Sequence, residues 1–288
     1  MSHPRERLTN KLLGYPDDAR LLLVNADDLG MYQAINEAVG QAFAQGIVRS
    51  TSLMMPCPGA AQAVAMLRDH PALGVGVHLS VIRDIATYGW GPLAPKERVP
   101  SLLAADGLFY TTDRMAEMLA RADLGELEVE FRAQVEAALS AGVAPTHLDW
   151  HCLHSGGRAD VFEMTLGLAL EYGVALRVAS QPFIDQTQRR GLPTTDYDML
   201  DSFRIAIETK PARYAAMLRE LPPGLTEWAV HPSLGDAASR IIDPDGWRVR
   251  RTDFEVLIAP EIRAIIEHEG IILIGYGPLQ AAWRGRSS

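Results

Sequence analysis

Leu21-Leu22-Leu23-Val24-Asn25-Ala26-Asp27-Asp28 is the stretch of the sequence that decides the fold. Its four consecutive apolar residues predict a short strand that is buried on both faces, as in a parallel sheet. Residues 33–45 follow with apolar side chains at every fourth position, which predicts a helix that ends at Gly46. This part of the chain is therefore predicted to be a strand–helix unit with two carboxylates where the strand ends.

The same alternation continues along the rest of the chain. Further strands are predicted over residues 50–55, 73–79, 146–149, 174–178, 225–230 and 270–274. Helices are predicted over residues 60–69, 112–122, 126–140, 161–172, 211–220 and 254–268, and the stretches 82–110 and 181–196 are irregular. Strands that alternate with helices indicate a mostly parallel sheet with right-handed crossovers.

The placement of polar residues favours a barrel over an open sheet. They cluster just past the ends of at least four well-separated strands, and a barrel brings such ends together. An open doubly wound sheet would instead have a phosphate-binding glycine loop after its first strand, where this chain has two carboxylates. We expect one α/β domain over residues 1–288, a distorted (β/α) barrel of seven to eight mostly parallel strands. In it, the loop 82–110 covers or rims the pocket.

Composition excludes several classes of protein. The chain has 288 residues, 48% of them hydrophobic, and a net charge of −9, which argues against binding to nucleic acid or to an anionic membrane surface. Two cysteines cannot make a disulfide framework, and no apolar run approaches the ~18–20 residues of a membrane helix. We expect a cytoplasmic protein, and a homo-oligomer stays open.

Asp27 and Asp28 are the first candidates for chemistry. Adjacent residues on a strand point to opposite sides, so one carboxylate can bind a metal while the other stays free as a base. The alternative is that the pair caps the following helix, because an aspartate there accepts bonds from unpaired backbone amides.

Histidines mark the ends of three further strands. His78 closes the third strand beside Gly76, although a lone histidine on an apolar strand is often a buried core residue. His147, Asp149 and His151 alternate and so share one face of an extended segment. Cys152 has the opposite parity and is expected in the core.

His231 ends a fourth strand, so the strand ends together offer carboxylates and histidines from distant parts of the chain. Two histidines and one carboxylate make a metal site with open positions, which suits Zn²⁺ and related ions. One more carboxylate and one more histidine then remain for acid–base work. The set as a whole suits metal-assisted hydrolysis of an amide or an ester.

Five motifs in this order resemble those of the YdjC-like carbohydrate deacetylases (ChbG/HpnK type), and the resemblance covers residues 20–277. They are Asn25-Ala26-Asp27-Asp28-Leu29-Gly30, Gly46-Ile47-Val48-Arg49-Ser50-Thr51, Gly76-Val77-His78-Leu79, Thr146-His147-Leu148-Asp149-Trp150-His151 and His231-Pro232. The chain departs from the family's pattern at Leu29, where the family has phenylalanine, and at Trp150, where it has serine.

The resemblance implies a divalent-metal N-deacetylase that acts on N-acetylated amino sugars in short oligosaccharides or glycolipid precursors. By matching positions, the ligands of one Mg²⁺ or Zn²⁺ ion would be Asp28, His78 and His151. Asp27 would be the general base, and His231 the general acid or a substrate contact.

Other side chains and other functions stay open at this point. Asp149 or His147 is expected to orient His151, and Trp150, Tyr88 and Trp90 are candidates to stack on sugar faces. The role of His154 is open. A metal-dependent phosphoesterase and a non-catalytic carbohydrate-binding barrel are the alternative functions.

Overall fold

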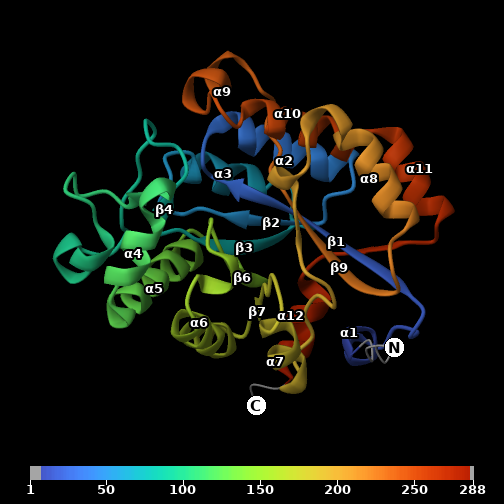
Figure 1. The fold of residues 1–288 in the computed structure, drawn as a ribbon, viewed down its shortest axis with the longest axis horizontal. Coiled ribbons are helices and arrows are strands. Elements are labelled where there is room, and N and C mark those ends of the chain that lie inside the picture. Colours follow the sequence, from blue (N-terminus) through green and yellow to red (C-terminus); the bar gives the residue numbers. More distant parts are fainter. Residues whose placement is uncertain (1–7, 286–288) are drawn as a thin grey trace.

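The centre of the computed structural model, which describes residues 8–285, is a curled sheet of eight strands (Figure 1). The strands follow the order β7-β6-β3-β2-β1-β9-β8, β10 lies beside β1, and every pairing is parallel. The strands are β1 (Arg20–Leu29), β2 (Ser50–Leu53), β3 (Gly74–Leu79), β6 (His147–Trp150), β7 (Ala175–Leu176), β8 (Leu200–Asp201), β9 (Gly224–Val230) and β10 (Ile272–Ile274). The predicted α/β fold is confirmed.

The two edge strands of the sheet, β7 and β8, approach each other without forming a ladder. A backbone hydrogen bond of 2.8 Å crosses the gap, from the N–H of Met199, just before β8, to the carbonyl of Ala179, after β7. The sheet is therefore curled into a half-barrel that stays open between β7 and β8, a distorted form of the predicted barrel.

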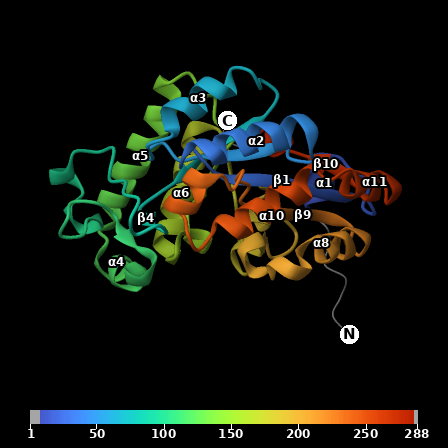
Figure 2. The same ribbon diagram turned by 90° about the horizontal axis from the view of Figure 1, so that it is seen from above.

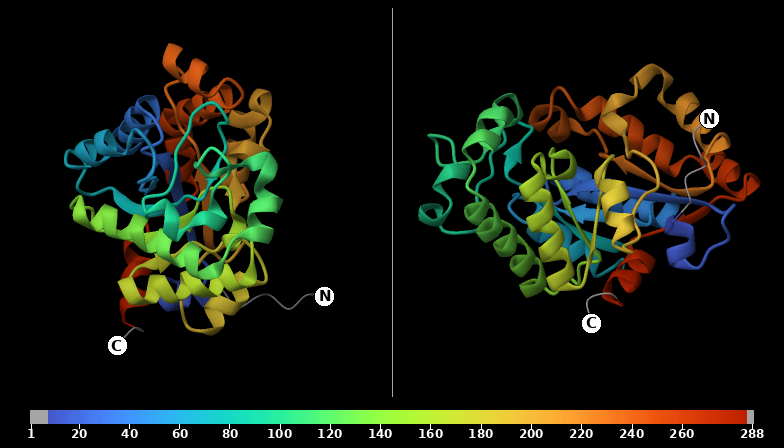
Figure 3. Two further views of the ribbon diagram at one scale, coloured as in Figure 1. Left: turned by 90° about the vertical axis from the view of Figure 1, so that its left-hand side faces the viewer. Right: turned by 60° about the horizontal axis from the view of Figure 1, so that its bottom comes forward.

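Helices surround the curled sheet on its outer side (Figures 1 and 3). Helix α2 packs along β1, α5 along β3, and α6 along β6 and β7. The helices are α1 (Leu8–Leu13), α2 (Gln33–Gln45), α3 (Ala60–Leu67), α4 (Met115–Arg121), α5 (Leu124–Ser140), α6 (Ala159–Tyr172), α7 (Phe183–Arg189), α8 (Lys210–Arg219), α9 (Ala237–Ile242), α10 (Trp247–Ile258), α11 (Pro260–His268) and α12 (Gly277–Arg284). None of those between residues 8 and 285 is long and apolar enough to cross a bilayer.

Strand β1 is the central strand, and its apolar run is fully buried. Leu21, Leu22, Leu23 and Val24 have no exposed surface. On one side β1 pairs with β9 over most of its length, and on the other it pairs first with β10 and then with β2. Because β1 is ten residues long, one of its edges can pair with β10 and then with β2 while the other pairs with β9. This strand therefore contacts three others at the centre of the sheet.

Two predicted elements differ from the observed ones. The helix expected over 254–268 is two helices, α10 and α11, because Pro260 holds the preceding Ala259 in an extended conformation with ψ of 126°. The stretch 181–196, expected to be irregular, contains α7.

The long segment after β3 lies beside α4 at one end of the molecule (Figure 2). Its two ends, β4 (Ile82–Arg83) and β5 (Tyr110–Thr111), pair with each other in parallel outside the main sheet. The Arg83 guanidinium joins them further by donating from Nε to the Phe109 carbonyl at 2.7 Å. The single-domain organisation stays a prediction.

Candidate active site and metal centre

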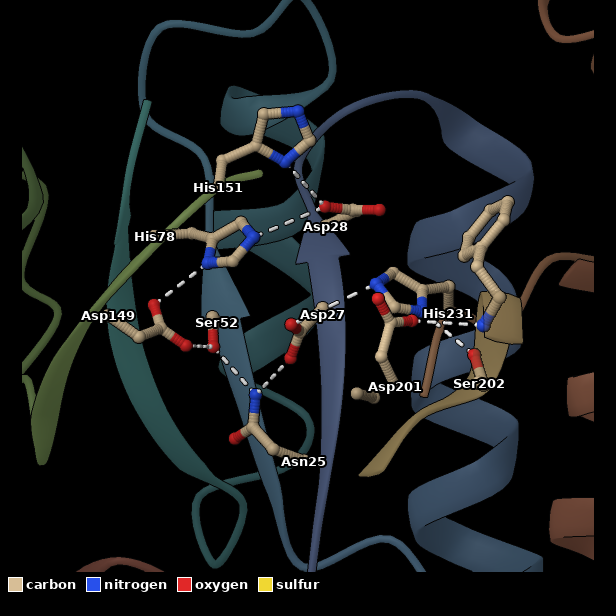
Figure 4. Close-up of polar contacts among 12 residues, drawn as sticks. Asn25, Asp27, Asp28, Ser52, His78, Asp149, His151, Asp201, Ser202 and His231 are labelled. Atoms are coloured by element: carbon tan, nitrogen blue, oxygen red, sulfur yellow. Dashed lines mark hydrogen bonds and ion pairs between the residues drawn. The ribbon is translucent and has the colours of Figure 1, made fainter. Parts of the chain in front are cut away.

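The carboxyl ends of β1, β3, β6 and β9 meet at one pocket of about 230 Å³ (Figure 4). All the side chains predicted to carry chemistry line it, namely Asp27, Asp28, His78, His151 and His231. The structure therefore brings these side chains together from four strands that are distant in the sequence.

A bulge in β1 positions the two carboxylates. The pairing of β1 with β2 shifts register between Ala26 and Leu29, and the residues between them are Asp27 and Asp28. Asp28 has a φ of 70°, in the left-handed region that residues other than glycine rarely adopt. Both side chains line the pocket, and their carboxylates contact different partners, Asp27 the guanidinium of Arg177 and Asp28 that of Arg250.

Asp28, His78 and His151 converge on one point. Asp28 Oδ1 lies 3.3 Å from His78 Nε2 and 3.1 Å from His151 Nδ1. One potential ligand atom from each of the three residues lies within 4.8 Å of the others, and all three side chains are buried. A carboxylate oxygen and two imidazole nitrogens are donors that Zn²⁺ and similar divalent cations accept.

The far side of each imidazole also fits a metal site. His78 Nδ1 lies 2.8 Å from Asp149 Oδ1, and His151 Nε2 lies 3.2 Å from Asp84 Oδ1. A carboxylate that takes the hydrogen of one ring nitrogen leaves the lone pair of the other free for a cation. Without a cation a proton takes that place. Burial opposes the charge on His78, but Asp149 and Asp28 raise its pKa to about 9. The donor set present therefore fits one divalent metal ion.

Arg250 of α10 occupies the second oxygen of Asp28. Its Nη1 donates to Asp28 Oδ2 at 2.6 Å, and its remaining nitrogens contact Asp243 at 2.8 Å and Asp84 at 3.3 Å. Burial opposes ionisation of Asp28, but Arg250 holds the pKa of its carboxyl well below the usual range. Only Oδ1 of Asp28 is left to face the two histidines.

Arg177, just past β7, binds the other carboxylate of the pair. It makes a two-pronged contact with Asp27 at 2.8 and 2.9 Å, and it also contacts Asp149 and Glu227 at 2.8 Å each. Burial raises the pKa of Asp27, but Arg177 more than offsets this and lowers it. Asn25 adds a hydrogen bond to Oδ1 at 2.7 Å, so Asp27 is held ionised and in one orientation.

His231, the residue after β9, lies on the opposite side of Asp27 from the metal-binding group (Figure 4). Its Nε2 is 3.9 Å from Asp27 Oδ2, and its Nδ1 is 2.9 Å from Ser202 Oγ. The edge of the ring packs against Phe203, with 4.8 Å between the ring centroids. One ring nitrogen of His231 thus faces Asp27 in the pocket, and the other contacts Ser202 behind it.

The residues around His151 differ from expectation. Asp149 contacts His78, and neither it nor His147 orients His151. That contact belongs to Asp84, which lies in the segment 82–110. His147 is a core residue whose ring stacks on Tyr276 at 3.7 Å, and burial lowers its pKa to about 3. The alternation of residues along β6 could not predict which histidine Asp149 contacts. That depends on the pairing of β6 with β3, which sets Asp149 beside His78.

Among the aromatic candidates, Trp150 lines the pocket, whereas Tyr88 and Trp90 do not. Trp90 is buried and packs edge-on against His151, and Tyr88 donates to the Met31 carbonyl. Cys152 was expected in the core but lines the pocket, because its φ of 60° turns the chain there. His154 also lines the pocket and accepts a hydrogen bond from Arg204 at 3.0 Å.

Three site residues were missed from the sequence: Asp84, Arg177 and Arg250. Arg177 stands near the end of a predicted strand, so the rule that found the histidines could have found it too. Asp84 lies in an irregular stretch and Arg250 inside a helix, and neither position carries a comparable local signal.

Comparison with known proteins identifies the same family as the motifs do. A carbohydrate deacetylase of Geobacillus stearothermophilus is 32% identical over 259 residues, 89% of this chain and 97% of that protein. A chitooligosaccharide deacetylase of Serratia marcescens is 28% identical over 88% of this chain and 97% of its own length. A solved structure from Enterococcus faecalis V583, described as a suspected cellobiose-phosphate cleavage protein, has a TM-score of 0.77 at 28% identity and covers 91% of this chain and 99% of its own. The model of the YdjC-like protein family matches residues 21–268, and the chain belongs to that family.

Proposed function

We propose that this protein removes acetyl groups from N-acetylated amino sugars, in short oligosaccharides or glycolipid precursors. One divalent ion, Mg²⁺ or Zn²⁺, would be held by Asp28, His78 and His151. The observation that carries the proposal is the convergence of these ligand atoms in the same pocket as Asp27 and His231. The deacetylases among the relatives support the substrate class.

The chain's own residues account for the proton transfers of such a hydrolysis. When bound, a divalent cation lowers the pKa of water and polarises a carbonyl. Asp27, kept ionised by Arg177, accepts a proton from the attacking water. His231, which carries a proton on both ring nitrogens at this step, then donates the one on Nε2 to the leaving amine, which cannot depart as an amide anion. The proton that Asp27 took from the water passes back to His231 Nε2 and restores both groups. His231 Nε2 and Asp27 Oδ2 lie 3.9 Å apart, which supports the proposal because both groups could then contact the same amide.

Two observations disfavour a phosphoesterase. The two other groups that could hold a metal each share a histidine with the first, so they do not make independent sites. Asp84, His151 and Cys152 share His151, and Asp27, His78 and Asp149 share His78, while Arg177 already holds both Asp27 and Asp149. Arg177 and Arg250 are already paired with carboxylates and are not free to bind a phosphate. A non-catalytic binding barrel, for its part, has no need for a buried ionised Asp27 beside the metal ligands.

The test measures amine release and metal content together. The metal-free protein is assayed on N-acetylglucosamine oligomers with added Mg²⁺ or Zn²⁺, and we expect activity only with metal. Asp28→Asn should lose bound metal, because an amide oxygen is a poorer ligand than a carboxylate. Asp27→Asn should keep the metal and lose ~10²–10⁴-fold in rate.

Asp113→Asn is the matched control, since Asp113 is exposed and does not line the pocket. It should change neither the metal content nor the rate. Hydrolysis of p-nitrophenyl phosphate without amine release would favour the phosphoesterase, and silence in both assays the binding protein. Retention of metal and activity by both site variants would refute the assignment.

A further inference from the structure

A buried chain of polar residues extends from His231 away from the pocket. His231 Nδ1 lies 2.9 Å from Ser202 Oγ, which donates to Asp253 Oδ2 at 2.5 Å. Asp253 Oδ1 in turn accepts from Lys210 Nζ at 2.7 Å. Ser202, Asp253 and Lys210 have no exposed surface, and they come from the turn after β8, from α10 and from α8.

Counting hydrogens along this chain indicates the state of each member. The Tyr214 hydroxyl also donates to Asp253 Oδ1, at 3.4 Å, which leaves Oδ2 to Ser202 and to the backbone. Asp253 is paired with a lysine ammonium, so it is a carboxylate and can only accept. The single hydroxyl hydrogen of Ser202 therefore goes to Asp253. Ser202 Oγ has only lone pairs left for His231, so the hydrogen between them belongs to His231 Nδ1.

The alternative arrangement is disfavoured by burial. A hydrogen on Nε2 alone would require the Ser202 hydroxyl to turn toward Nδ1, which removes a donor from a fully buried carboxylate. Asp253 Oδ2 also accepts a hydrogen bond from the backbone N–H of His231 at 3.0 Å. This one oxygen therefore positions the main chain of His231 directly and its ring through Ser202.

Lys210 balances the charge of the buried carboxylate. Asp253 therefore adds no unpaired negative charge behind His231, which already faces the ionised Asp27. The chain of contacts orients the ring and selects its tautomer, and the pocket-side nitrogen is left as the site that gains and loses a proton.

We infer that Ser202, supported by Asp253 and Lys210, is a positioning residue that keeps the proton of neutral His231 on Nδ1 and so reserves Nε2 for proton transfer to the leaving amine. The inference rests on the proposed function for its catalytic consequence. The tautomer itself is a property of the chain alone. An NMR measurement of the ring nitrogens therefore separates the two.

The first experiment is ¹⁵N NMR of the full-length protein labelled at histidine, with the His231 signals assigned from His231→Ala. We expect a protonated Nδ1 and an unprotonated Nε2 at a pH where the ring is neutral. Ser202→Ala should give a mixture of tautomers, and Ser202→Thr, which restores a hydroxyl, should restore the single form. Ser233→Ala is the control, because the hydroxyl of this buried serine contacts Ser239 and not the ring.

The second experiment measures deacetylation and metal content of the same variants. Ser202→Ala should lower kcat about 10-fold with KM and bound metal unchanged, less than the ~10²–10⁴-fold expected of His231→Ala. In a His231→Ala background, Ser202→Ala should cost nothing further, since its effect passes through the ring. Ser202→Thr should recover most of the rate.

An Nε2–H tautomer in the unchanged protein would overturn the inference without any variant. A Ser202→Ala protein that keeps both the tautomer and kcat would also overturn it. If the protein releases no amine yet shows the Nδ1–H form, and Ser202→Ala loses that form, the positioning role stands and the proposed function fails.

Discussion

Replacing Gly76 with alanine tests the packing that holds β3 and its histidine in place. Gly76 pairs across the sheet with His147 of β6. A Cβ at residue 76 would lie 2.4 Å from both Cε1 and Nε2 of the His147 ring. The ring has no room to retreat, because its other face stacks on Tyr276 with the two planes only 13° apart.

The size of the effect follows from that distance. Ordinary contacts begin near 3.4 Å, so β3 or the ring must move by about 1 Å inside a close-packed interior. Overpacking of this kind costs about 1–3 kcal/mol, and we expect about 2 kcal/mol at Gly76 because the ring is clamped on both faces. His78 lies two residues further along β3, so a shift of the strand should also weaken metal binding.

Gly74, on the same strand, supplies the control. A Cβ there would meet only the Arg49 carbonyl at 3.4 Å and two hydroxyls at 3.7 Å, which are ordinary contacts. Gly74→Ala should therefore be neutral or stabilise by up to about 1 kcal/mol, because alanine reduces the freedom of the unfolded chain. Urea denaturation of both variants measures the difference. Equal free energies of unfolding would refute the reasoning.

Two further predictions concern buried charge. Burial lowers the pKa of His147 from 6.5 to about 3, so the unfolded chain holds a proton that the folded chain lacks, and stability should fall by about 1.4 kcal/mol per unit as pH drops through this range. His147→Gln should flatten this acid limb in denaturation curves, whereas His268→Gln, at an exposed histidine, should leave it unchanged. Arg250→Met leaves the buried Asp28 without its cation and should cost about 3–5 kcal/mol in the presence of a chelator. The loss should be smaller with Mg²⁺ or Zn²⁺ bound, and an equal loss in both conditions would show that no metal shares Asp28.

The residues that we propose to bind the metal and to transfer protons could be predicted to lie together, because they follow strand ends. Asp27, His78, His151 and His231 each stand at or just past the end of a predicted strand, and parallel strands bring such positions to one edge. No knowledge of side-chain contacts is needed for that step.

The supporting half was not predictable, because its members meet only through tertiary packing. Arg250 lies 222 positions after Asp28 in the sequence and contacts it from the buried face of α10. The residue pattern of this helix predicts that one face is buried but not which residue that face contacts. Asp84 reaches His151 from an irregular segment. The bulge at Asp28 could not be predicted either. The sequence around it is typical of an ordinary strand, and the bulge becomes evident only from the register with β2.

The bulge matters because it assigns two adjacent carboxylates to two separate ion clusters. Asp27 belongs to the cluster centred on Arg177, and Asp28 to the one centred on Arg250, which also contacts Asp84 and Asp243. Each guanidinium contacts three carboxylates, so charge alone does not distinguish the two clusters. Both oxygens of Asp27 accept from Arg177, whereas Asp28 keeps Oδ1 free of arginine, and this oxygen faces His78 and His151. A dication would therefore bind at Oδ1 of Asp28. The two-pronged contact with Arg177 occupies both oxygens of Asp27, which keeps this carboxylate from being a ligand. The proposed division of roles between a metal ligand and a base thus follows from which arginine each carboxylate meets, and not from any difference between the two residues in the sequence.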